Sequence, residues 1–161
     1  MKFRPVLILL IVISLSSFAG GCRSVLTEKT LSSTDDQLLF ETLVADPNQH
    51  IGKVITLGGE IIRLRPLGPK TEIEFAEIPL YDEGRPALGF DPGEHFFVLF
   101  PERVDATLFT RGKVVTIAGK VIGTRRVDGV DHPLLAHEEA HVWNQLREDR
   151  FPSYGALMGG F

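Results

Sequence analysis

The chain has 161 residues, of which 43% are hydrophobic, with 17 Lys and Arg against 21 Asp and Glu and a single Cys. This length fits one globular domain, and a single Cys excludes an internal disulfide and leaves only His and carboxylate ligands for a zinc site. The acidic excess argues against a nucleic-acid-binding protein, because neutralising phosphates requires clustered Lys and Arg.

The first 21 residues have the layout of a bacterial export signal. Lys2 and Arg4 provide a positive start, residues 6–13 form an unbroken apolar run, and residues 14–21 are small and polar. The apolar run is too short to cross a bilayer as a helix. We therefore expect residues 1–21 to be a signal peptide.

Cys22, the only Cys, follows this segment directly. The arrangement resembles the lipobox of bacterial lipoproteins, in which the preceding peptide is removed and the Cys receives acyl chains, although Ala19 stands where that pattern usually has Leu. Several acyl chains hold a protein firmly on a membrane. The resemblance implies the lipoprotein processing and sorting machinery as partners, and Arg23, in place of an Asp that favours inner-membrane retention, favours the outer membrane. The alternative is a secreted protein with an unpaired thiol, a liability in an oxidising compartment.

The segment after the Cys divides into a tether and a helix. Residues 22–34 are polar and rich in Ser and Thr, which predicts a flexible tether without a stable fold. From Ser33 to Gln37, hydroxyl side chains precede acidic and amide side chains at cap spacing, and two apolar i,i+4 pairs follow within residues 39–44; this pattern predicts a short amphipathic helix. Pro47 ends the helix near Ala45, because the residue before a proline avoids the helical region.

An internal repeat dominates the rest of the chain. Residues 52–62 (GKVITLGGEII) recur as residues 112–122 (GKVVTIAGKVI), with six of eleven positions identical. Both copies are rich in β-branched residues, which predicts two long strands. Small residues halfway, Gly58-Gly59 and Ala118-Gly119, predict a bend in each strand, and in the first copy a change of apolar parity beyond the glycines predicts a β-bulge there.

Further strands are predicted between and after the repeats. Residues 71–80 alternate polar and apolar, as in a half-exposed strand, whereas residues 95–100 are apolar on both faces, as in a buried one. Residues 81–93 carry Gly and Pro and predict an irregular connection, and residues 101–111 predict a helical turn. Residues 133–143 fit a strand or a helix.

These elements together predict a mostly β fold. About five strands, two of them long and bent, favour a small OB-like barrel with one short N-terminal helix. We expect this domain to occupy residues 35–146 and residues 147–161 to form a disordered tail.

One motif has catalytic spacing: His137-Glu138-Glu139-Ala140-His141 is a literal H-E-x-x-H. On a helix this spacing places both imidazoles on one face to bind Zn²⁺, and the Glu polarises the attacking water. A third ligand is hard to find, since no His follows and the acidic residues downstream are close to a flexible end. A surface stretch with His at its edges is the favoured interpretation, and a zinc-dependent hydrolase is the alternative.

Two charged groups are further candidates. Glu72 and Glu74 share one strand face, with Glu77 nearby, but carboxylates on an exposed strand are usually plain surface. A basic strip able to bind an anionic glycolipid is the second candidate. It consists of Arg63, Arg65, Lys70, Arg125 and Arg126, among which Arg65 and Arg125 are equivalent in the two repeats. Trp143 is expected in the core or at its rim.

Several segments resemble the Slp family of starvation-inducible outer-membrane lipoproteins, over roughly residues 22–144. In chain order they are Gly21-Cys22, Leu43-Val44-Ala45-Asp46-Pro47, Gly52-Lys53-Val54, Gly58-Gly59, Pro79-Leu80, Gly84-Arg85-Pro86, Gly93 with Phe96-Phe97-Val98, and Gly112-Lys113-Val114-Val115-Thr116-Ile117-Ala118-Gly119. The resemblance implies a place at the periplasmic face of the outer membrane and an association with starvation and envelope stress. It implies no reaction and no catalytic residues, and the family has no fixed H-E-x-x-H.

The sequence therefore predicts a lipid-anchored envelope protein with a non-enzymatic binding or structural role and no cofactor. Its expected partners are the membrane, through acyl chains on Cys22, and an envelope protein or glycolipid of unknown identity. Nucleic acid is not expected as a partner.

Overall fold

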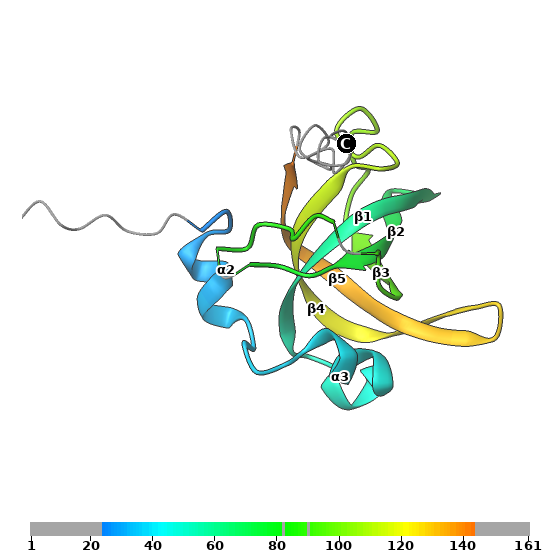
Figure 1. The fold of residues 1–161 in the computed structure, drawn as a ribbon. Helices are drawn as coiled ribbons and strands as arrows, with labels where there is room; N and C mark the ends of the chain where they lie inside the picture. Colours follow the sequence, from blue (N-terminus) through cyan, green and yellow to red (C-terminus); the bar gives the residue numbers. More distant parts are fainter. Residues whose placement is uncertain (1–23, 82, 90, 144–161) are drawn as a thin grey trace, which may run out of the picture.

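Five strands form a closed barrel in the computed structural model, which describes residues 24–81, 83–89 and 91–143 (Figure 1). The strands are β1 (Val54–Leu67), β2 (Lys70–Ile78), β3 (His95–Phe100), β4 (Val114–Val127) and β5 (Val130–Trp143). Two short helices, α2 (Glu28–Ser33) and α3 (Phe40–Ala45), and a 3-10 turn, η1 (Pro47–His50), precede them. The predicted mostly β class is confirmed.

The barrel closes in the order β1-β2-β3-β5-β4, with β4 pairing back onto β1. The β3–β5 pairing is parallel and the other pairings are antiparallel. This confirms the small OB-like barrel expected from the sequence, and the ambiguous residues 133–143 belong to β5. Closure gives every strand a partner on both sides, which removes the free edges of an open sheet.

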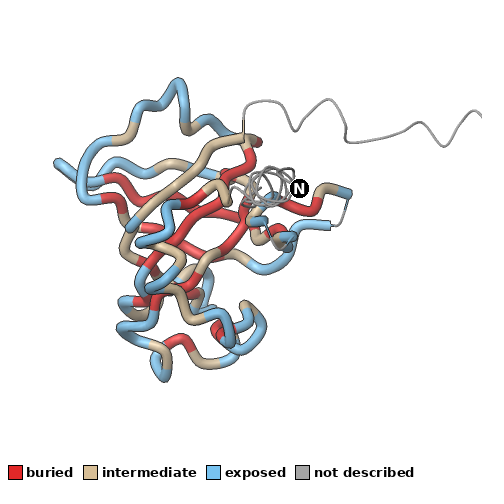
Figure 2. Tube along the Cα trace, turned by 90° about the vertical axis from the view of Figure 1, so that its left-hand side faces the viewer, coloured by how far each residue is buried: buried red, intermediate tan, exposed pale blue. Residues whose placement is uncertain are grey.

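The two repeats supply matched halves of the barrel core. Ile55, Leu57 and Ile61 of β1 and their repeat partners in β4 are all buried in one apolar cluster. The partners, sixty residues later, are Val115, Ile117 and Val121. Figure 2 shows buried stretches of the chain running through the centre of the molecule. The repeat is therefore a repeat of inward-facing positions.

The predicted β-bulges are confirmed in part. In the β1–β2 pairing the register shifts at Ile62, three residues beyond the predicted Gly58-Gly59. The β4–β5 pairing shifts twice, between Ala118 and Gly119, as predicted, and at Ile122, the repeat equivalent of Ile62. The change of apolar parity in the first repeat thus indicated a bulge in β1 but misplaced it.

The small residues have a different role, which is close approach. A Cβ atom on Gly59 would lie 3.0 Å from the Phe75 Cβ, and one on Gly119 would lie 3.0 Å from the Leu135 Cβ. At Gly58 the added atom would be 2.4 Å from the carbonyl oxygen of Ile78. Side chains and backbone of the neighbouring strands occupy this space, which explains the glycines.

Strand β2 is buried on both faces, which corrects the prediction of a half-exposed strand. Ile73 and Phe75 are fully buried in the core, and the alternate residues Glu72 and Glu74 are each only 7% exposed. The reason is that long side chains from neighbouring strands cover the outer face of β2.

The N-terminal segment also differs from its prediction. Residues 28–33 form α2 where a tether without stable structure is expected, and Leu26 just before it is buried. Helix α3 ends at Ala45 as predicted but begins only at Phe40. The cap signals before it form a separate turn instead, in which the Gln37 amide donates to the Asp35 carboxylate over 3.1 Å.

Residues 101–111 contain a single helical turn, as predicted. The amide of Phe109 donates to the carbonyl of Asp105 over 3.0 Å. The signal segment 1–21, Cys22 and the tail 147–161 lie outside the described residues. Among the helices that the structure describes, none has the length and apolar character needed to cross a membrane.

Candidate functional site

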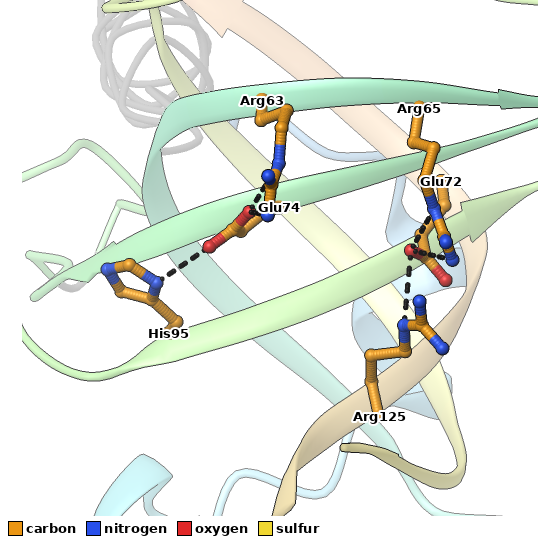
Figure 3. A network of polar contacts seen from close by, with 6 residues as sticks. All are labelled: Arg63, Arg65, Glu72, Glu74, His95 and Arg125. Atoms are coloured by element: carbon orange, nitrogen blue, oxygen red, sulfur yellow. Dashed lines mark hydrogen bonds and ion pairs between the residues drawn. The ribbon is translucent and has the colours of Figure 1, made fainter. Parts of the chain in front are cut away.

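A network of opposite charges covers the outer face of β2 (Figure 3). Arg63 donates from Nε and Nη2 to Glu74 Oε2, over 3.1 and 2.8 Å. Arg65 donates from the same two nitrogens to Glu72 Oε1, over 3.0 and 2.7 Å. The β1–β2 pairing places each arginine opposite its carboxylate, because the bulge at Ile62 brings the arginines into register.

The second repeat completes the network. Arg125 of β4 places Nε 3.4 Å from Glu72 Oε1, so the repeat-equivalent Arg65 and Arg125 meet on one carboxylate. On the other side, His95 Nδ1 of β3 lies 2.9 Å from Glu74 Oε1. Each glutamate thus contacts two basic side chains from two different strands.

The cations of this network lie outermost. The side chains of Glu72 and Glu74 are 8% and 9% exposed, whereas those of Arg63, Arg65 and Arg125 are 64%, 44% and 36% exposed. Three guanidinium groups above two carboxylates leave one excess positive charge. Solvent therefore meets a positively charged surface.

A hollow of about 170 Å³ lies among these side chains. We call it the arginine cleft; its lining consists of Arg63, Leu64, Arg65, Glu72, Glu74, Phe97, Arg125 and Val127. Guanidinium groups at the mouth and apolar walls below suit a small anionic group, because a lower local dielectric strengthens each charge interaction.

The predicted basic strip is only partly formed. Arg63, Arg65 and Arg125 come together, but Arg126 instead pairs with Asp131, its Nη1 lying 3.4 Å from Oδ2. Lys70, at the start of β2, does not line the cleft. The sequence interpretation of Glu72 and Glu74 as plain surface is wrong, because the arginines of both repeats cover them. The signal available in the sequence was that these two glutamates and the two arginines of β1 carry opposite charges at matching spacing. The pairing becomes visible only once the position of the bulge in β1 is known.

Glu77 lies apart from the other two carboxylates. It lines a larger hollow, of about 450 Å³, between the N-terminal segment and the barrel wall. Burial raises the pKa of Glu77, and the negative charge of Glu41 adds to the shift. Paired carboxylate chemistry through these three residues is therefore not supported.

The H-E-x-x-H segment lies on strand β5 and not on a helix, so the geometry assumed for zinc is not formed. The register shift opposite Ala118 and Gly119 falls within the motif. The His137 ring stacks on Phe100 with centroids 4.2 Å apart, and the His141 ring meets Trp143 edge-on at 4.7 Å. Nowhere in residues 24–81, 83–89 and 91–143 do three or more His, Cys, Asp or Glu side chains gather as a metal site would require.

The acidic residues of the motif have other partners. Glu138 lies 3.3 Å from Lys120 Nζ. Glu139 accepts hydrogen bonds from the backbone and hydroxyl of Thr27 and from the hydroxyl of Thr30, which fastens α2 to β5. Desolvation alone would raise the pKa of Glu139, but these hydrogen bonds outweigh it and hold the pKa below its ordinary range. Burial lowers the pKa of His137.

Trp143, expected at the core or its rim, is half-buried at the end of β5. Its Nε1 donates to the Thr116 hydroxyl over 2.9 Å, and that hydroxyl donates to the Gly84 carbonyl over 2.7 Å. The indole therefore has a structural partner.

Comparison with known proteins decides the family. The model of the outer membrane lipoprotein Slp family matches residues 19–158. The chain belongs to the Slp family. The resemblance carried by its dispersed segments is thereby confirmed, and the match supports a lipoprotein of the cell envelope.

Two proteins similar to this Slp-family chain are a curated lipoprotein and a solved structure. An uncharacterized lipoprotein, YeaY, of Escherichia coli strain K12 is 28% identical over 110 residues, which cover 68% of this chain and 55% of YeaY. The chain thus spans about half the length of that curated relative. Among solved structures, the OBody AM3L09 bound to hen egg-white lysozyme aligns with a TM-score of 0.41 at 20% identity, covering 60% of this chain and 86% of that one.

Proposed function

We propose that this Slp-family protein is anchored in the outer membrane by acyl chains on Cys22, after removal of residues 1–21. Its barrel then faces the periplasm and serves there by binding or structural support, without catalysis. The observation that carries the proposal is the lipobox-like Gly21-Cys22 within the family match, at the end of an export-signal pattern.

The docked N-terminal segment supports a short link between anchor and domain. Ser24 is already part of the described structure, Leu26 is buried, and α2 is fastened to β5 through Glu139. Two residues of extended chain span at most about 7 Å. The barrel is therefore held close to the membrane and not at the end of a long tether.

A role without catalysis is supported by the state of the one motif with catalytic spacing. His137 and His141 are packed against separate aromatic rings, and Glu138 and Glu139 have separate partners. A function in starvation or envelope stress is part of the proposal and is supported by the resemblance to Slp proteins alone.

The test is expression of the full chain in a Gram-negative host with radioactive palmitate. We expect the wild type to incorporate label and fractionate with the outer membrane. Cys22→Ser should lose both the label and the outer-membrane location, because no thiol is left to acylate, while the control Ser24→Ala should keep both. Unchanged fractionation of Cys22→Ser would contradict the anchor.

A further inference from the structure

We infer that the arginine cleft binds the phosphoryl group of a phosphate monoester. This inference names a class of ligand for the proposed binding role. It rests on the proposed function only in assuming that the protein acts in the cell envelope. Neither the family nor the relatives assign such a site.

The first argument is the direction of the charges. Glu72 and Glu74 lie beneath the arginines and are almost inaccessible, whereas the guanidinium groups reach the surface. An approaching anion therefore meets cations first, and the carboxylates lie behind them. The excess of one positive charge in the network is what an added anion would compensate.

The second argument is that Arg125 has donors to spare. Its Nε is buried without a hydrogen bond, and its 3.4 Å approach to Glu72 is an ion pair without hydrogen-bond geometry. Among the described residues its terminal nitrogens have no hydrogen-bond acceptor, in contrast to Arg63 and Arg65, which each place two donors on a carboxylate. A guanidinium held in place with unused N–H groups is suited to bidentate phosphate binding.

The third argument is preorganisation. Arg65 and Arg125 come from equivalent positions of the two repeats and converge on Glu72, so the carboxylate fixes two guanidinium groups near one point. Ordering two long side chains costs free energy, and here that cost falls on folding and not on ligand binding. The buried glutamates thus act as positioning residues for the arginines.

The size and walls of the cleft narrow the ligand. About 170 Å³ accommodates a phosphoryl group with a few attached carbon atoms. Leu64, Phe97 and Val127 line the interior, and they suit the carbon side of a phosphate ester better than a free, fully hydrated ion. A phosphorylated polyol and the headgroup of a phosphomonoester lipid share this chemistry.

The test uses the ¹⁵N-labelled full chain in zwitterionic detergent micelles and follows the Nε–H signals of the arginines by NMR. The probes are glycerol 3-phosphate, inorganic phosphate, and phosphatidate added to the micelles. We expect saturable shifts of the Arg65 and Arg125 signals with at least one phosphomonoester. Saturation by glycerol 3-phosphate identifies a soluble ligand, and saturation by phosphatidate alone identifies a lipid headgroup.

Substitutions provide the decisive comparison. Arg125→Gln should weaken binding about tenfold or more, the loss expected for a charge-assisted hydrogen bond. Arg125→Lys should recover part of it, because it restores the charge without the planar fork. The matched control is Arg126→Gln, since Arg126 is the next residue of β4 but pairs with Asp131.

Two results would overturn the inference: no saturable shift with either phosphomonoester, including the case in which inorganic phosphate alone saturates the signals, or equal weakening by Arg125→Gln and Arg126→Gln. The Trp143 fluorescence of each variant reports whether the barrel is intact. Binding in micelles does not depend on acylation of Cys22, so a failure here leaves the anchor proposal standing, and a failed palmitate experiment leaves the cleft standing.

Discussion

At the scale of single residues, one hydroxyl connects three parts of the chain. Thr116 on β4 is fully buried and accepts from Trp143 at the end of β5 while donating to Gly84 in the loop between β2 and β3. Its repeat partner Thr56 has a different contact, lying 3.3 Å from the hydroxyl of Thr34. Identical residues of the repeat thus meet different neighbours, which the sequence alone does not show.

We predict that Thr116→Val lowers the free energy of unfolding by about 1–3 kcal/mol, because the indole N–H and the Gly84 carbonyl both lose their partner. Urea unfolding followed by far-ultraviolet circular dichroism measures the change. Thr56→Val is the control. The Thr56 hydroxyl is only partly buried, so its removal should lower the free energy of unfolding by less. Equal losses in the two variants would show that the bridge contributes nothing specific.

His137 predicts a pH dependence. Since burial lowers its pKa, the folded protein holds this proton less readily than the unfolded chain does. Stability should therefore fall as the pH is lowered through the ordinary range of histidine, about 6 to 7. Comparing the midpoints of thermal unfolding across this range for the wild type and His137→Phe tests it, because the phenylalanine still stacks on Phe100 but does not titrate. A slope unchanged in the variant would assign the effect elsewhere.

At the scale of elements, hydrophobic pattern and the repeat predicted the strands well and their details less well. Strands β1 to β4 and the end of α3 follow from local composition and period, whereas residues 133–143, which belong to β5, fitted a strand or a helix. The bulge of β1 was predicted at Gly58-Gly59 and lies at Ile62, because a change of parity shows that a residue has been inserted but not where. The arginine cleft was not predicted for the same reason, because its ion pairs form only in the strand register that the bulge sets.

The close approach at Gly58 makes a prediction for the β1–β2 pair. Gly58→Ala places a Cβ 2.4 Å from the Ile78 carbonyl oxygen, so the two strands must separate, and we expect a loss of about 1–3 kcal/mol or more. Gly93→Ala is a matched control, because its nearest contact, at 2.5 Å, is the carboxylate end of Glu77, which can rotate away. Equilibrium unfolding of both variants measures the change in the free energy of unfolding. A smaller loss for Gly58→Ala than for Gly93→Ala would contradict close approach of the strands as the reason for Gly58.

At the scale of the whole molecule, the N-terminal segment belongs to the domain. Hydrogen bonds join Thr27 and Thr30 to Glu139, more than a hundred residues later in the chain. No local sequence pattern predicts such a contact. The polar composition of residues 24–34 suggested a tether because the partners of those hydroxyls lie on β5. Membership of the Slp family can be predicted from the sequence, but the packing of α2 against β5 cannot.

We predict that Glu139→Ala releases α2 and exposes the bond after Lys29 to trypsin. Cleavage at that site should become several-fold faster than in the wild type, because α2 is too short to persist without its contacts. Mass spectrometry of timed digests identifies the fragment. Glu138→Ala, which removes only the contact with Lys120, is the control and should leave cleavage unchanged. Equal rates for the wild type and Glu139→Ala would show that the segment is held by other contacts.

The placement of the two hairpin ends has one further consequence. In Figure 1 the chain enters at α2, on one side of the barrel, and the β1–β2 and β4–β5 hairpins point to the other. Glu139, which holds α2, pairs with Ala118 of β4, and Arg125 lies seven residues further along that strand, a rise of about 23 Å in an extended strand. An anchor on the α2 side would thus leave the arginines more than two Debye lengths, each about 8 Å, from the lipid surface. The arginines would then interact with soluble anions of the periplasm and not with the surface potential of the membrane that holds the anchor. We therefore expect glycerol 3-phosphate to be the probe that saturates the cleft.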